Sequence, residues 1–281
     1  MGDTNSSLSS QDLVELVGTA GCPRLIDVRR ATAFAEAEDV LPTAVWRDHT
    51  AAEVWGADLA SDQEIVVYCV HGHQVSQSAA ALLRQVGVAA RYLDGGIEGY
   101  RAAGGPLTKR VALAGQEDDQ PTRWVTRERP KIDRVACPWL IRRFVDREAA
   151  IYFVEPDWVE AAAVELKAIP FDIPEVAFSH EGERCSFDAF IKAFGLAHPA
   201  LERVARIVRG ADTGHLELAP EAAGLLAFSL GLSAIEGDDQ AMMERGFLIY
   251  DALYGWARHA ADESHGWPPA PSTQIPTQVS P

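Results

Sequence analysis

Apolar residues in the first third of the chain fall into short continuous runs separated by stretches with helical spacing. The runs cover residues 24–29, 64–69 and 90–93 and are typical of strands buried in a parallel sheet. Helical stretches precede or follow them at 11–17, 31–38, 76–85 and 97–103. Strands that alternate with helices predict an α/β fold, with a parallel sheet covered by helices on both faces.

A different pattern begins near residue 123. Strands are predicted only at 124–126 and 150–154, and the remaining apolar residues mostly have helical spacing. A helix is expected to start at Cys137-Pro138, with Pro138 at its first position. Further helices are expected at 156–167, 199–209, 220–232 and 239–259, and the apolar helix at 220–232 should be core. This part is therefore predicted to be a mostly helical domain with a few short strands.

Two stretches lack an apolar pattern. Residues 111–122 include three acidic residues and a proline, and this composition predicts an exposed linker. The proline-rich tail at 262–281 is expected to be disordered. The predicted organisation is a first domain at 1–110, a linker at 111–122, a second domain at 123–261 and a tail at 262–281.

Composition narrows the function classes. The net charge of −16 argues against a nucleic-acid partner, which would need a basic surface. No apolar run reaches membrane-spanning length, and the first residues lack the pattern of a secretory signal, so we expect a cytoplasmic protein. The four cysteines are widely spaced and suggest neither a zinc finger nor a disulfide framework.

Cys69 has the setting of a reactive cysteine. It ends the predicted strand 64–69 and precedes a loop that enters the helix at 76–85. Loop N–H groups and the helix dipole would favour a thiolate there, and Gly72 would let the loop curl. Asp27 and Asp94 fall at the same edge of the predicted sheet, where function gathers in α/β folds. The alternative is a buried, inert cysteine.

Three ordered motifs over residues 8–110 resemble a single rhodanese domain: Leu25-Ile26-Asp27-Val28-Arg29, the Cys69 loop, and Tyr92-Leu93-Asp94-Gly95-Gly96-Ile97 through Pro106-Leu107. The resemblance implies that Cys69 accepts sulfur as a persulfide. It also implies that Asp27 and Arg29 are a structural strand-end pair. It further implies an anionic sulfur donor and an acceptor thiol, with no cofactor.

The loop departs from the family pattern Cys-x-x-Gly-x-Arg-Ser. Gln74 and Val75 occupy the last two places, so the arginine that helps to hold an anionic donor is missing. His71 and His73 could replace part of that charge when protonated. Three interpretations stay open: a persulfide carrier with sulfurtransferase activity, a redox thiol, or a binding loop without chemistry.

The second domain opens with a local reversal of charge. Residues 123–147 hold eight basic and three acidic residues, a net charge of +5 in a chain of −16. Arg134, Arg142 and Arg143 lie near a predicted helix amino terminus and are candidates for binding an oxyanion. The alternative is that these cations pair with acidic residues of the same chain.

A divalent metal site is also predicted in the second domain. His180 and Glu183 lie on a polar turn, and Asp212 lies in a second polar stretch at the end of the helix 199–209. Imidazole and carboxylate suit zinc, manganese or iron, although the spacing matches no standard signature. The alternative for Asp212 is that it only terminates the helix.

The second domain resembles the carboxy-terminal domain of the chromate-resistance protein family. The motifs are the stretch 124–144, Pro170-Phe171-Asp172-Ile173-Pro174, residues 180–188 and Arg209-Gly210-Ala211-Asp212-Thr213. The resemblance implies a link to chromate or oxidative stress. Regulators of that family carry a different amino-terminal domain, so a DNA-binding role does not transfer. The functional alternatives are sulfur transfer or thiol redox chemistry at Cys69, and a non-enzymatic sensor or resistance protein that binds chromate, another oxyanion or a metal.

Overall fold

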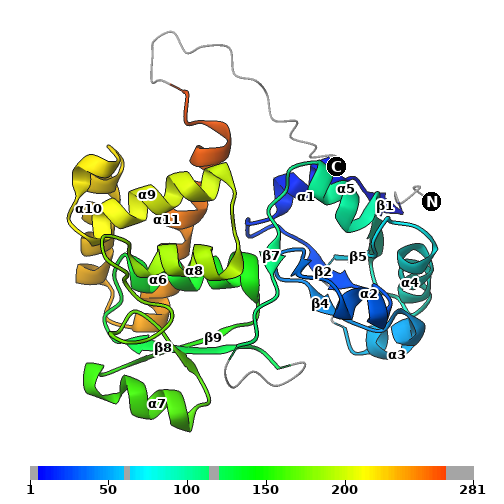
Figure 1. The fold of residues 1–281 in the computed structure, drawn as a ribbon, viewed down its shortest axis with the longest axis horizontal. Coiled ribbons are helices and arrows are strands. Elements are labelled where there is room, and N and C mark those ends of the chain that lie inside the picture. The colour runs from blue at the N-terminus through cyan, green and yellow to red at the C-terminus, as the bar shows by residue number, and fades with distance from the viewer. Residues whose placement is uncertain (1–5, 60–63, 114–119, 264–281) are drawn as a thin grey trace.

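The structure, a computed structural model, describes residues 6–59, 64–113 and 120–263. It divides into an amino-terminal half built on a parallel sheet and a carboxy-terminal half dominated by helices (Figure 1). This is the fold class that the sequence pattern predicts. The last eighteen residues of the expected disordered tail, 264–281, lie outside the described ranges.

The amino-terminal sheet has five parallel strands in the order β1-β6-β5-β2-β4. Their bounds are β1 (Ser7–Leu8), β2 (Arg24–Asp27), β4 (Val45–Trp46), β5 (Ile65–Tyr68) and β6 (Ala90–Leu93). Side chains of the central strand β5 alternate between two apolar clusters. Ile65 and Val67 pack in one cluster, and Val66 and Tyr68 pack in the other. Both faces are therefore covered, which explains the uninterrupted apolar run in the sequence.

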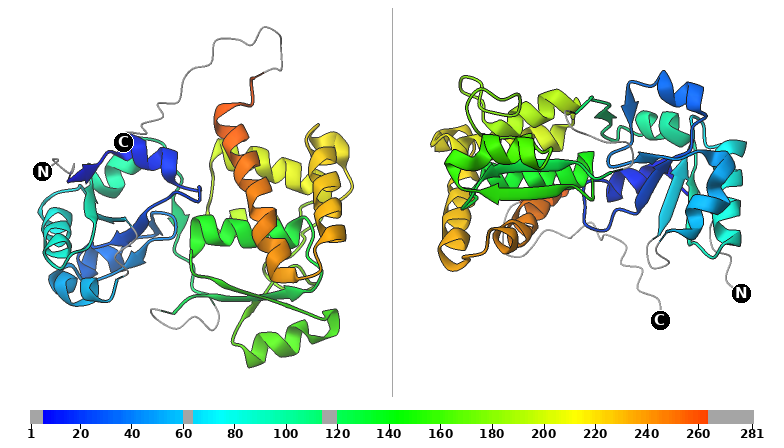
Figure 2. Two further views of the ribbon diagram at one scale, coloured as in Figure 1. Left: turned by 180° about the vertical axis from the view of Figure 1, so that it is seen from behind. Right: turned by 90° about the horizontal axis from the view of Figure 1, so that it is seen from below.

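Helices cover both faces of this sheet (Figure 2). Residues of α3 (Ala52–Ala57) and α4 (Gln74–Gln85) join the cluster of Ile65, and residues of α1 (Ser10–Leu16) and α5 (Gly96–Ala102) join the cluster of Val66. The short helix α2 (Ala31–Ala35) follows β2. A two-stranded antiparallel ribbon of β3 (Asp39–Val40) and β7 (Thr108–Lys109) ends this half.

The carboxy-terminal half has a parallel three-stranded sheet in the order β10-β8-β9. The strands are β8 (Arg123–Arg127), β9 (Ala150–Val154) and β10 (Ile169–Pro170). In Figure 1, α7 (Val159–Glu165) lies on one side of this sheet and the other helices on the opposite side. Those helices are α6 (Asp133–Leu140), α8 (Ser186–Phe194), α9 (Pro199–Asp212), α10 (Ala222–Ile235) and α11 (Asp239–His259).

The expected helix start at Cys137-Pro138 is wrong. Helix α6 begins four residues earlier, at Asp133, and Pro138 lies in its interior. The start is fixed by a tertiary contact, because the buried Asp133 carboxylate accepts a hydrogen bond of 2.7 Å from the Ser186 amide. Pro138 cannot donate to the carbonyl of Arg134. One turn later the chain widens into a π-helical stretch at Ile141–Val145.

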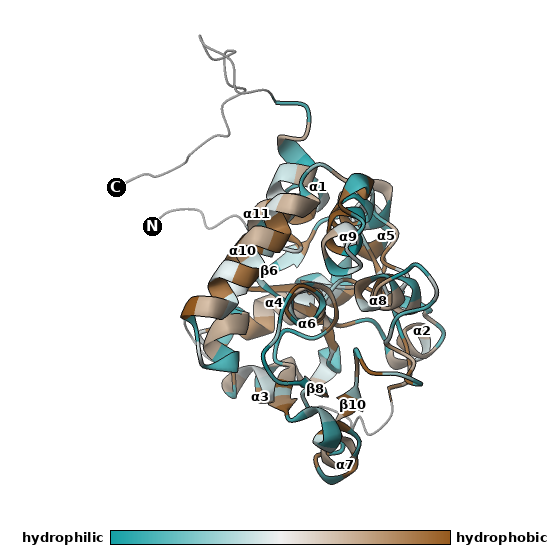
Figure 3. Cartoon of the chain, turned by 90° about the vertical axis from the view of Figure 1, so that its left-hand side faces the viewer, coloured by the Kyte–Doolittle hydropathy of each residue, from teal (hydrophilic) through white to brown (hydrophobic). Residues whose placement is uncertain are grey.

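The expectation that residues 220–232 are core is also wrong. Only Ala222, Leu225 and Ser229 of α10 are buried, and 68% of Phe228 is exposed. The largely hydrophobic α10 lies at the outside of the helical layer (Figure 3). An apolar helix without a polar face gives no signal of which side packs inward.

The two halves share one apolar core. The main cluster joins residues of both, including Tyr100 of α5 and Trp139 of α6. Thr108 Oγ1 donates a hydrogen bond of 2.6 Å to the carbonyl of Phe144, and Arg147 Nη2 donates one of 2.5 Å to the carbonyl of Cys22. The second domain is therefore packed directly on the first. No helix in the described ranges combines the length and hydrophobicity needed to cross a bilayer.

Candidate functional sites

Cys69 lies where β5 ends, on the loop that leads into α4. Its side chain is 7% exposed, and it belongs to neither of the two apolar clusters that flank the sheet. The Sγ atom lies 3.2 Å from the Ser76 hydroxyl, which is itself 3.2 Å from the carbonyl of His73. The thiol is thus set in a polar loop at the carboxyl edge of the sheet.

The backbone N–H groups of the Cys69 loop are the second feature of this site. Among the described residues, no backbone or side-chain group accepts a hydrogen bond from the N–H groups of residues 70–76. Several of them belong to the first turn of α4, where helix amides have no intrahelical partner. The helix dipole adds a positive end at the same place. The loop can therefore hold a negative charge on or next to the Cys69 sulfur.

The stretch 94–98 holds this loop in shape. Ile97 N donates to the Cys69 carbonyl at 3.0 Å, and Glu98 N donates to the Val70 carbonyl at 3.1 Å. A Cβ atom on Gly96 would come within 2.4 Å of the Cys69 carbonyl, and Gly96 has a φ of +61°. Gly72 has a φ of +70° and an equally close approach to the Leu93 carbonyl. Both glycines are therefore required by the backbone of the Cys69 loop.

The other predicted loop residues point toward solvent. His71, His73 and Gln74 are all exposed, and the two imidazole rings lie 5.9 Å apart. Gln74 is the first residue of α4. Gln77 of α4 also holds the backbone of the loop, because its Nε2 donates a hydrogen bond of 3.0 Å to the Gly72 carbonyl.

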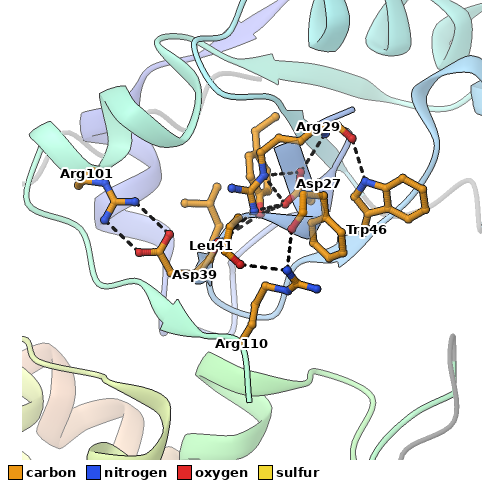
Figure 4. A network of polar contacts seen from close by, with 10 residues as sticks. Asp27, Arg29, Asp39, Leu41, Trp46, Arg101 and Arg110 are labelled. Atoms are coloured by element: carbon orange, nitrogen blue, oxygen red, sulfur yellow. Dashed lines mark hydrogen bonds and ion pairs between the residues drawn. The ribbon is translucent and has the colours of Figure 1, made fainter. Parts of the chain in front are cut away.

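Asp27 and Arg29 form a buried pair rather than part of the open loop (Figure 4). Arg29 Nε donates to both carboxylate oxygens of Asp27, at 3.0 and 2.8 Å, and Tyr68 donates to Oδ2 at 2.9 Å. Burial would lower the pKa of Arg29, but the hydrogen bond and charge of Asp27 raise it overall. Arg29 also donates to the Asp39 carbonyl at 3.0 Å, so the pair ties β2 to β3.

The three predicted oxyanion arginines are not gathered into one site. Arg143 makes a two-pronged ion pair with Asp251 of α11, with both distances 2.9 Å. Arg142 is ion-paired with Glu244 of the same helix. This is the alternative arrangement, in which the cations are matched by acids of the chain. Arg134 lies elsewhere, 3.4 Å from Asp172.

A cluster of acidic residues around His180 forms a second candidate site. His180 Nε2 lies 3.2 Å from Asp212 Oδ2, 3.5 Å from Asp133 Oδ2 and 3.5 Å from Asp172 Oδ1. Ligand atoms of Asp133, His180 and Asp212 all lie within 4.8 Å of one another. The structure thus brings His180 and Asp212 together, as predicted. Glu183 is exposed and is not a member of this group.

Sequence reasoning did not place Asp133 and Asp172 in this cluster. Asp133 begins α6, in a segment far from His180 in the sequence, whereas Asp172 follows β10 only eight residues before His180. The residue before Asp133, Ile132, has a φ of +38°, and Asp172 has a φ of +54°. Backbone strain of this kind gathers at functional sites, but it leaves no mark in the sequence.

Proton affinities in the cluster are strongly shifted. The hydrogen bond to Asp133 raises the pKa of His180 to about 9, against a partial desolvation penalty. Burial raises the pKa of Asp212 to about 7, and the neighbouring Asp133 and Asp172 carboxylates act in the same direction. Burial also raises the pKa of Asp133. Shifted pairs of this type are frequent at functional sites.

The other three cysteines are poor nucleophiles. Burial raises the pKa of Cys22 to about 11 and also raises the pKa values of Cys137 and Cys185 well above their ordinary value. Cys137 and Cys185 are fully buried. Because the thiolate is the reactive form, these three thiols are protonated and unreactive at neutral pH.

Comparisons with known proteins agree with both halves of this description. Residues 9–103 match the model of the rhodanese-like domain, and residues 124–257 match the model of the ChrB C-terminal domain. Protein ChrB of Cupriavidus metallidurans is 33% identical over 136 residues, which are 48% of this chain and 40% of that relative. This chain therefore spans less than half of the length of that curated relative.

Two solved structures overlap the amino-terminal half. A rhodanese-related protein from Thermoplasma volcanium is 23% identical and covers 36% of this chain and 95% of its own, with a TM-score of 0.32. A rhodanese-like domain protein from Staphylococcus aureus is 17% identical and covers 34% and 90%, with a TM-score of 0.31. Likenesses this limited add nothing about chemistry. The two family models together describe the architecture: a region that matches the rhodanese-like domain is followed by a region that matches the ChrB C-terminal domain.

Proposed function

We propose that the protein handles sulfane sulfur through Cys69 and serves in resistance to chromate. The observation that carries the proposal is the Cys69 thiol at the start of a loop whose amides, from residue 70 to residue 76, have no acceptor among the described residues. The rhodanese-like and ChrB-type domains support the pairing of sulfur chemistry with chromate resistance.

The proposed reaction is a nucleophilic transfer. The Cys69 thiolate attacks the sulfane sulfur of a donor such as thiosulfate, and a new S–S bond forms on the cysteine. The S–S bond of the donor breaks, and its electron pair leaves with sulfite. An acceptor thiolate then attacks the outer sulfur of the persulfide and restores Cys69. The loop amides and the start of α4 stabilise the anionic sulfur in both states.

The loop favours a donor with little need for a cation. Gln74 is neutral, and the described loop has no guanidinium group to pair with an anion. His71 and His73 are exposed and can add positive charge only when protonated. We therefore expect weaker use of thiosulfate than of persulfides of small thiols, which place no anionic sulfonate group next to the transferred sulfur.

Mass spectrometry of the intact protein tests this proposal. After incubation with thiosulfate or glutathione persulfide, the wild-type chain should gain one sulfur atom, about 32 Da, that a thiol reductant removes. Cys69→Ser should gain none. Cys22→Ser is the matched control, because Cys22 is a half-buried thiol outside the loop, and it should behave like the wild type. An unmodified wild-type protein, or equal gain in Cys69→Ser, would rule the proposal out.

A further inference from the structure

We propose that Asp133, His180 and Asp212 bind one divalent transition-metal ion, independently of Cys69. The three residues come from the first residue of α6, the loop before α8 and the last residue of α9. Their ligand atoms lie within 4.8 Å of one another, close enough to contact one ion after small side-chain movements. This donor set replaces the predicted one, with Asp133 in the place of Glu183.

A buried oxygen of Asp133 points to a ligand. The side chain of Asp133 is 1% exposed, and its Oδ2 accepts the Ser186 amide at 2.7 Å. Its other oxygen, Oδ1, is buried and has no hydrogen-bond partner among the described residues. A buried carboxylate oxygen without a partner carries a large desolvation cost. A bound cation would remove that cost.

The carboxylates of the cluster are not all paired with arginines of the chain, which favours a bound cation. Asp172 already has partners: Arg127 donates to it at 2.8 Å, Arg134 lies 3.4 Å away and the Ser186 hydroxyl donates at 2.8 Å. Among the described residues, Asp133 and Asp212 make no ion pair with an arginine, although the charge of Arg134 acts on Asp212, and the ion-pair partner that they share is His180. A divalent ion held by two carboxylates and a neutral imidazole would be balanced in charge.

The donor set selects the kind of ion. Two carboxylates with one imidazole suit Mn²⁺, Fe²⁺ or Zn²⁺ better than Ca²⁺, which takes oxygen ligands, or Cu⁺, which prefers sulfur. The His180 side chain is 42% exposed and that of Asp133 is 1% exposed, so solvent reaches the cluster from the side of His180. Three protein ligands and one open side leave positions for water or for a small ligand.

Metal titration of the full-length Cys69→Ser protein tests the site. That background removes the thiol beside His71 and His73, which could otherwise bind zinc. The protein is treated with chelator and titrated with Mn²⁺ and Co²⁺, with Ca²⁺ as the comparison. We expect a single ion per chain by elemental analysis and a visible Co²⁺ absorption band.

Two substitutions identify the ligands, and a third is the control. His180→Gln and Asp212→Asn, both at partly exposed positions, should each weaken Mn²⁺ and Co²⁺ binding at least ~10-fold and abolish the rise in melting temperature with metal. Glu183→Gln, three residues from His180 on the same loop, should bind like the parent protein. Circular dichroism checks that each variant is folded.

The outcomes are distinct. Absence of stoichiometric binding, or equal binding by the two ligand variants and the parent protein, would mean that His180 is only an ion-pair partner of the aspartates. Loss of binding in Glu183→Gln would also overturn the proposed donor set. Because Cys69 is absent throughout, none of these results depends on persulfide formation.

Discussion

At the scale of single residues, the surroundings of His198 favour the neutral form of its imidazole. It precedes α9 as its N-cap, and its buried Nδ1 has no hydrogen-bond partner among the described residues. Burial lowers its pKa below the ordinary 6.5, the nearby Arg258 lowers it further, and Glu202 opposes them. The ring lies 6.4 Å from that of Tyr254.

We predict that protonation of His198 destabilises the protein in mild acid. Below about pH 6.5 the unfolded chain takes up a proton at this position that the folded chain resists, so stability falls as pH falls. His198→Asn places a residue that is favoured at the N-cap and removes the titration, and any gain from the cap itself does not vary with pH in this range. The free energy of unfolding in urea should decline more in the wild type than in this variant between pH 7.5 and 5.5.

Comparison with the variant isolates His198. His180, whose pKa is raised to about 9, and Asp212, whose pKa is raised to about 7, favour the folded state at low pH, and both titrate in either protein. Their effects therefore cancel in the difference. Parallel pH profiles for the two proteins would show that His198 carries no penalty.

Residue positions can be predicted where local sequence defines the geometry. An apolar strand, a glycine and a helix start surround Cys69 in the sequence, and the structure places it after β5 and before α4. Asp133 could not be grouped with His180, since only the packing of α6 against the loop before α8 brings them together. The ion pairs of Arg142 and Arg143 depend on α11, more than a hundred residues away.

At the scale of elements, the start of α8 is fixed by Asp188. Its Oδ2 accepts the Cys185 amide at 3.1 Å and Arg209 Nε of α9 at 2.8 Å. Its Oδ1 accepts Arg209 Nη2 at 2.5 Å. One carboxylate, 6% exposed, thus caps one helix and joins it to the next.

We predict that Asp188→Ala lowers the free energy of unfolding by about 2–4 kcal/mol, because it removes a helix cap and leaves Arg209 without its partner. Lys192→Met on the same helix is the control. Lys192 pairs with Glu181 at the surface, where both side chains are largely exposed, and its loss should not be measurable. Denaturant unfolding measures both. Equal effects would mean that the Asp188 contacts contribute little.

Element types were predictable, and several boundaries were not. The expected helix at 199–209 extends to Asp212, which keeps Asp212 in a helix rather than in a terminating turn. The expected helix at 156–167 ends at Glu165 and starts with a tighter turn at Pro156–Trp158. Local patterns gave the periodicity, but the last turn of a helix is decided by contacts with other elements.

At the scale of the molecule, Gly18 marks the contact between the two domains. It follows α1 with a φ of +80°, and a Cβ atom there would lie 2.5 Å from the Phe144 ring and 2.7 Å from the Tyr254 ring. Both rings are buried in the second domain. The sequence pattern only ends the predicted helix at residue 17, just before Gly18, because nothing local records what packs against this glycine.

We predict that Gly18→Ala is more destabilising than Gly104→Ala by about 1–3 kcal/mol. Gly104 has nearly the same φ, +82°, but nothing lies within 4 Å of an added Cβ atom. Backbone strain is therefore matched, and the difference reports the domain contact alone. Melting temperatures and denaturant midpoints of the two variants test this. Indistinguishable values would mean that the domains can separate slightly without cost.

The contacts around Cys22 and Glu15 also limit how the chain can be recombined. Arg147 ends on the Cys22 carbonyl, and Arg258 ends on the carbonyls of Val14 and Glu15. Because these acceptors are main-chain carbonyls, a chimera that joins another rhodanese-like unit to this carboxy-terminal half would keep them only where the backbone of that unit follows the same course from Val14 to Cys22. The boundary at which this protein could be recombined with other domains therefore lies inside the first domain rather than between the two domains.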